Sequence, residues 1–109
     1  MEVKSAAALK VFAADKMTKL SLFETRRFFC DLYCFERGQA QKGHVHQGED
    51  KVYFVLEGRG RFTVGKEEAE LGAMEATLAP AGVTHGVVNN GPGRLVVLVF
   101  MAPHPRPKG

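Results

Sequence analysis

The sequence predicts an all-β domain built as an antiparallel sandwich or barrel. After residue 17 the chain consists of short apolar runs rich in Val, Phe, Tyr, Leu and Thr, the residues that strands favour. Glycine-bearing turns separate these runs at a spacing of about 8–12 residues, which is typical of all-β folds. No helical pattern lies between the runs, so the crossovers that a parallel sheet requires are absent.

The predicted strands follow one another with turn residues between them. Glycine, asparagine and proline fill the breaks near residues 38, 58, 65, 80–82 and 89–93, and these residue types favour tight turns. About nine strands are predicted, over residues 18–23, 26–35, 43–46, 51–56, 60–64, 67–71, 75–79, 86–89 and 94–101.

The two ends of the chain differ from this pattern. Residues 6–20 are the one segment with loosely helical spacing of apolar residues, and they fit a short helix or an extended arm equally well. Residues 103–109 contain three prolines and cannot continue a central strand. We therefore expect a single domain over residues 1–109, with an N-terminal arm or helix (1–17), a barrel (18–102) and a flexible tail (103–109).

Composition and charge limit the class of protein. The chain has 109 residues, of which 45% are hydrophobic and 25% charged, so one ordinary globular core is expected. The net charge is only +3 and the basic residues are scattered, which argues against nucleic-acid binding. No apolar run approaches the roughly 18 residues of a membrane span, and Lys10 interrupts the weakly signal-like start. These features predict a cytoplasmic protein that binds neither nucleic acid nor membrane.

Three histidines form the candidate functional site. His44 and His46 are separated by one residue, so both imidazoles project from the same face of a strand. His85 follows the turn at residues 80–84, which would direct it inward at a barrel mouth. Neutral imidazole is the commonest protein ligand for metals, so the trio predicts a metal site. The alternative is a set of strand histidines that face solvent or make hydrogen bonds in the core.

The spacing of these histidines relative to glycine, proline and asparagine resembles the two sequence motifs of the cupin superfamily. The resemblance implies an antiparallel double-stranded β-helix, also called a jelly roll. It also implies a divalent metal ion (Zn, Fe, Mn, Ni or Co) bound by His44, His46 and His85. The matching residues are Gly38, His44, His46 and Gly58 in the first motif and Pro80, Gly82, His85 and Asn89 in the second.

The chain departs from the cupin pattern at two positions. Lys51 stands where cupins usually have a glutamate ligand, and a protonated lysine offers no lone pair. Either Asp50 supplies the carboxylate, or the site has three histidines and solvent. Met74 replaces a motif glycine, and because Met takes a positive φ only with strain, we expect the turn to shift to Gly72.

A homodimer is also expected. Within residues 51–56, Lys51, Tyr53 and Val55 share one face of the strand, and the other face is wholly apolar. A strand that is apolar on both faces is covered on both faces. A second copy of the chain is therefore the expected partner, with the N-terminal arm as an element that the two copies exchange.

The resemblance implies a metal-dependent enzyme acting on a small organic molecule, either a sugar or sugar phosphate isomerase-like enzyme or a dioxygenase-like one. Lys51 and Tyr53 are then the polar catalytic groups of the pocket. The alternative is a non-catalytic cupin that binds a small ligand or forms a structural dimer, with Lys51 pairing with an anionic ligand. Fold alone does not decide between these functions.

Overall fold

The structure is a computed structural model that describes residues 1–105, so residues 106–109 of the predicted tail lie outside it. Every predicted strand is present, and the strand ends differ from the prediction by at most three residues. The helix is a single turn. The elements are α1 (Ala6–Leu9), β1 (Thr18–Glu24), β2 (Phe29–Phe35), β3 (Ala40–His44), β4 (Asp50–Glu57), β5 (Arg59–Val64), β6 (Glu67–Gly72), β7 (Ala76–Ala79), β8 (His85–Val88) and β9 (Leu95–Ala102).

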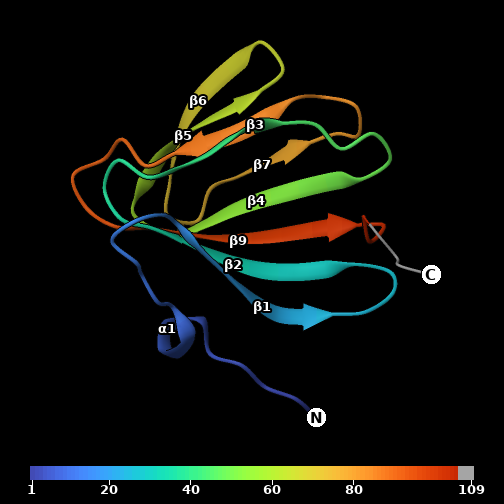
Figure 1. The fold of residues 1–109 in the computed structure, drawn as a ribbon, viewed down its shortest axis with the longest axis horizontal. Helices are drawn as coiled ribbons and strands as arrows, with labels where there is room; N and C mark the ends of the chain where they lie inside the picture. The colour runs from blue at the N-terminus through green and yellow to red at the C-terminus, as the bar shows by residue number, and fades with distance from the viewer. Residues whose placement is uncertain (106–109) are drawn as a thin grey trace.

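The strands form two antiparallel sheets. One sheet has five strands in the order β1-β2-β9-β4-β7, and the other has four in the order β3-β8-β5-β6. Figure 1 shows the five-stranded sheet across the lower part of the view and the strands β3, β5 and β6 above it. The chain alternates between the sheets, so strands distant in sequence become neighbours, as β2 and β9 do. The predicted double-stranded β-helix is confirmed.

The main core lies between the two sheets. Alternation along β4 turns Lys51, Tyr53 and Val55 inward, where all three are buried, and leaves the residues between them half-buried on the outer face. Both sheets supply the remaining core side chains. The buried cluster comprises Tyr33, Phe35, Tyr53, Val55, Phe62, Val87, Leu95, Val97 and Val99.

The N-terminal segment covers part of the outer face of the five-stranded sheet. Ala6 and Phe12 pack against a second buried cluster that includes Leu22, Leu32 and Val96. Figure 1 shows α1 beside β1 and β2, away from the four-stranded sheet. The arm thus contains one helical turn and packs against its own chain.

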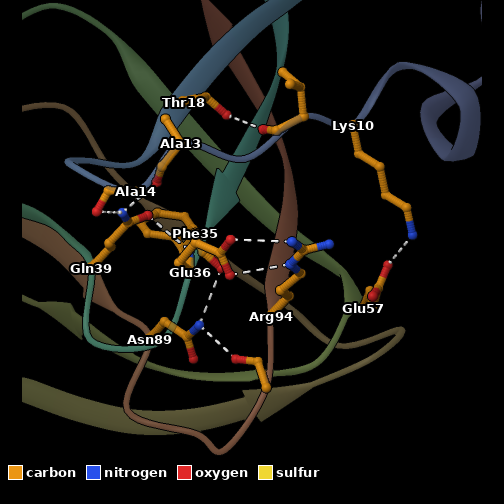
Figure 2. A network of polar contacts seen from close by, with 12 residues as sticks. Lys10, Ala13, Ala14, Thr18, Phe35, Glu36, Gln39, Glu57, Asn89 and Arg94 are labelled. Carbon is orange, nitrogen blue, oxygen red and sulfur yellow. Dashed lines mark hydrogen bonds and ion pairs between the residues drawn. The ribbon is translucent and has the colours of Figure 1, made fainter.

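Polar contacts fasten the arm and the turns to the barrel (Figure 2). Lys10 pairs with Glu57 at 2.7 Å, and the side-chain amide of Gln39 donates to the carbonyl of Ala13 at 2.8 Å. Asn89, a motif residue, is fully buried. Its amide donates to the carbonyls of Phe35 at 3.2 Å and of Gly93 at 2.8 Å. Asn89 therefore closes the turn before β9.

Two turns show why the motif residues matter. Gly58 has φ +85°, and a Cβ placed there would lie 2.1 Å from the carbonyl oxygen of Arg94, so only glycine fits. The expected shift of the second-motif turn to Gly72 is wrong, because Met74 itself takes the left-handed conformation, with φ 72°. Hydrogen bonds hold it there: the Met74 amide donates to Val55, and the Glu75 carboxylate accepts from the Gly72 amide.

Among residues 1–105, the structure contains no helix long and apolar enough to cross a membrane.

Candidate metal centre

The three predicted histidines meet at one end of the four-stranded sheet. His44 ends β3 and His85 begins β8, and the two are directly paired across these antiparallel strands. His46 lies two residues beyond the end of β3. The ring centroid of His44 is 4.4 Å from that of His85 and 5.0 Å from that of His46, and the His46 and His85 centroids are 5.7 Å apart. One ligand nitrogen from each ring lies within 4.8 Å of the others.

Hydrogen bonds to the Nδ1 atoms orient the rings. Nδ1 of His44 lies 2.9 Å from the carbonyl of Lys42, and Nδ1 of His85 lies 3.0 Å from the carbonyl of Val83. Because a carbonyl only accepts, Nδ1 carries the proton in both rings, and the lone pair is left on Nε2. In His46, Nδ1 lies 3.6 Å from a carboxylate oxygen of Glu49. This support of the second ring nitrogen is typical of histidines that bind metal.

Burial keeps the imidazoles neutral. His85 is only 1% exposed, and burial, with a smaller contribution from the charge of Lys51, lowers its pKa to about 4. Burial also lowers the pKa values of His44 and His46, which are half-buried. Neutral imidazoles have the free lone pair that metal binding needs.

The donor set fits a divalent metal ion. Nε2 of His85 is buried and has no hydrogen-bond partner within residues 1–105, which is unusual for a buried polar atom. A metal ion at the point where the three rings meet would satisfy this atom. Three imidazoles match the three-protein-ligand sites in which further coordination positions stay open for solvent or substrate.

Asp50 does not join the histidines. It alternates with the inward-facing Lys51 on β4, and its exposed carboxylate accepts a hydrogen bond from the backbone amide of Ala81 at 2.9 Å. Among residues 1–105 the only metal-ligating cluster is His44, His46 and His85. Of the two ligand sets left open by the sequence, the geometry favours three histidines.

Lys51 and Tyr53 face the histidines from the five-stranded sheet. The Tyr53 ring is 6.1 Å from the His85 ring, and the Nζ atom of Lys51 is 5.1 Å from the Tyr53 ring. Burial raises the pKa of Tyr53, so its hydroxyl stays protonated and donates to Oε1 of Gln41 at 2.8 Å. The structure thus brings both predicted pocket residues to the histidine centre, where their catalytic roles stay predictions.

Sequence analysis did not identify Gln41 as a pocket residue. Its Oε1 atom accepts from both Tyr53 and, at 3.4 Å, Lys51. Side chains alternate between the two faces of a regular strand, and Gln41 is three positions before His44. A regular strand would therefore place these two side chains on opposite faces. The register of β3 shifts between Gln41 and His44, however, so both side chains turn inward. Gly43 lies within the shifted stretch, and an isolated glycine inside a strand is the sequence signal that could have indicated this bulge.

Comparison with known proteins places the chain in a family. A model of the cupin domain matches residues 31–101, which contain both motifs. Uncharacterized protein SCO3923 of Streptomyces coelicolor is 32% identical over 93 residues, which are 84% of this chain and 86% of that protein.

Solved structures give the same result. TT1209 from Thermus thermophilus is 45% identical, with a TM-score of 0.93 over 95% of this chain and 99% of that chain. An uncharacterized conserved protein with a double-stranded β-helix domain from Klebsiella pneumoniae has a TM-score of 0.87 at 21% identity, over 94% of this chain and 90% of that one, which supports the fold. The family match, the two-sheet fold and the histidine cluster agree, and this chain belongs to the cupin family.

Proposed function

We propose that this cupin is a metal-dependent enzyme that binds a small organic molecule at the centre formed by His44, His46 and His85. One observation carries the proposal: three imidazoles converge, and the buried Nε2 atom of His85 has no hydrogen-bond partner within residues 1–105. Two reaction classes suit such a centre, an isomerase-like conversion of a sugar or sugar phosphate and dioxygenase-like chemistry.

The roles of the chain's own residues follow from their contacts. A divalent ion bound there would supply open coordination positions and polarise a substrate oxygen. The backbone carbonyls at residues 42 and 83 hold the rings of His44 and His85 in orientation. Tyr53 and Lys51 face the rings from the five-stranded sheet, and both donate hydrogen bonds to Gln41 on β3.

Metal analysis tests the centre. Protein purified without a chelating column is expected to contain about one equivalent of a divalent metal, and its removal is expected to lower the melting temperature because the ion binds only the folded chain. His46→Ala should reduce the metal content at least tenfold. The matched control is His104→Ala, because His104 pairs with Glu24 outside the cluster. Full metal content in His46→Ala contradicts the proposal.

A non-catalytic ligand-binding module is the second candidate. It is favoured by the absence of a carboxylate among the described residues that cluster with the imidazoles. NMR of sugars and sugar phosphates mixed with metal-loaded and chelator-treated protein separates the two candidates. New product signals that require the metal support the enzyme. Line broadening without conversion supports the binding module.

A further inference from the structure

A buried lysine without a carboxylate partner faces the histidine centre. Lys51 is 1% exposed, and its Nζ atom lies 5.3 Å from the Tyr33 ring and 5.1 Å from the Tyr53 ring. Its one hydrogen bond among residues 1–105 is the long contact of 3.4 Å to Gln41. No carboxylate of these residues lies within ion-pair distance of the Nζ atom.

This arrangement leaves the ammonium group incompletely satisfied. An ammonium has three donors, and buried charges in proteins are paired or fully hydrogen-bonded as a rule. The tyrosine rings stabilise the charge from the side, because each presents a π face within cation–π distance. The rings and the glutamine hold the lysine in place but provide no negative charge, so the ammonium keeps the capacity to donate to an anionic group.

Charged side chains of both signs surround the histidine centre. Lys19 lies with its Nζ atom 5.2 Å from the Tyr33 ring. The charges of Lys51 and Lys19 both contribute to the lowered pKa values of His44 and His46. Two carboxylates also face this region. Asp31 acts weakly on Lys51, and Glu49 lies beside His46. A bound divalent ion would add further positive charge.

We propose that Lys51 binds an anionic oxygen group, a carboxylate or a phosphate, of the molecule that this centre accepts. This inference rests on the proposed function, because the part of the molecule beyond its anionic group would lie at the metal. Lys51 is then the residue that selects anionic over neutral substrates. Gln41 and the rings of Tyr33 and Tyr53 act as positioning groups that hold the ammonium toward the histidines.

Binding of small probes tests this role directly. Glycolate and methyl phosphate carry the two anionic groups, and glycolamide is a neutral counterpart of glycolate. Dissociation constants are measured by ligand-observed NMR with zinc-loaded and with metal-free protein. The variants are Lys51→Met, Lys51→Gln and the control Lys66→Met, which removes an exposed lysine in the turn between β5 and β6.

We expect the wild-type protein to bind at least one anion more than tenfold more tightly than glycolamide. Lys51→Met and Lys51→Gln should each weaken the binding of that anion at least tenfold without changing the zinc content. Lys66→Met should change neither the anion affinity nor the zinc content. The anion that shows the dependence on Lys51 identifies the group as carboxylate or phosphate.

Other outcomes separate this inference from the metal site. Equal anion affinity in the wild-type protein and the Lys51 variants, or no preference for either anion, overturns the role of Lys51 even when zinc binds. Failure to bind zinc contradicts the proposed function alone, because the metal-free titrations still report on Lys51. Circular dichroism of both Lys51 variants establishes which of them is folded for the comparison.

Discussion

At the scale of single residues, Lys51 stands where an apolar side chain of similar length would make the folded chain more stable. Burial lowers its pKa to about 7, with a smaller contribution from the charge of Lys19. Below about pH 7 both the folded and the unfolded chain carry the proton, so the whole cost of burying the charge is present. Between this pH and the unfolded pKa of 10.5, the unfolded chain binds more protons, and stability rises with pH.

Lys51→Met is therefore expected to stabilise the metal-free protein. The gain should be of the order of 1–4 kcal/mol near neutral pH, as for other replacements of buried charge by apolar groups. It should shrink as the pH rises toward 10.5, because folded Lys51 is already neutral there and keeping it neutral costs less as the pH nears the unfolded pKa. Urea unfolding at about pH 6.5 and about pH 9.5 measures both effects. A variant less stable than wild type at the lower pH contradicts this account.

The candidate ligand residues were the most predictable part of the site. The sequence indicated His44, His46 and His85 because each lies in a short motif with a fixed spacing, and because imidazole is the commonest protein ligand for metals. The surroundings of Lys51 were harder to predict. The residue itself stood out by its charge, but its contacts with Tyr33 and Gln41 join three strands and depend on how the two sheets pack.

At the scale of elements, the strands were predictable because turn residues separate them and apolar positions alternate within them. Their irregularities were harder to predict. Gly43 indicates a bulge in β3, but which side chains then face inward depends on the pairing of β3 with β8. Likewise, the turn at Met74 is held by hydrogen bonds to Val55 on another strand: the Met74 amide donates to the Val55 carbonyl, and the Val55 amide donates to the carbonyl of Glu75. These bonds override the preference of Met for negative φ.

Met74→Gly should stabilise the fold by about 0.5–1 kcal/mol. A left-handed conformation costs a non-glycine residue roughly 1–2 kcal/mol, and glycine removes this cost. Glycine also gives the unfolded chain more conformational entropy, which lowers the gain in stability by about 0.5–1 kcal/mol. The control is Ala73→Gly in the same turn, where φ is not positive and glycine should destabilise. Urea unfolding of both variants measures the difference. If both lose stability equally, the left-handed turn is not strained.

At the scale of the whole molecule, one apolar face is only partly covered. The N-terminal arm packs over the outer side of β1, β2 and the start of β9, but outer-face residues at the other end of β9 and on β7 remain exposed. Phe100 is 38% exposed and Leu78 is 51% exposed, and both are paired across strands with Val52. We propose that a second copy of this chain covers the surface formed by Val52, Leu78 and Phe100, as a homodimer requires.

Light scattering after size-exclusion chromatography tests the dimer. The wild-type protein should have about twice the monomer mass of 12.0 kDa. Leu78→Glu should shift the protein to monomer, because it places a charge within the proposed interface. Lys66→Glu places a carboxylate in the exposed turn between β5 and β6, outside this surface, and should remain dimeric. A monomeric wild-type protein, or a dimeric Leu78→Glu, contradicts the proposal.

The carbonyl groups that accept from His44 and His85 have a further consequence. Each belongs to the main chain two positions before its histidine, at Lys42 and at Val83. The tautomer of both imidazoles is thus set by the path of the backbone, and substitutions at these two positions leave the acceptors in place. Sequences with the same turns can therefore vary freely at positions 42 and 83 while they keep the same two nitrogens available.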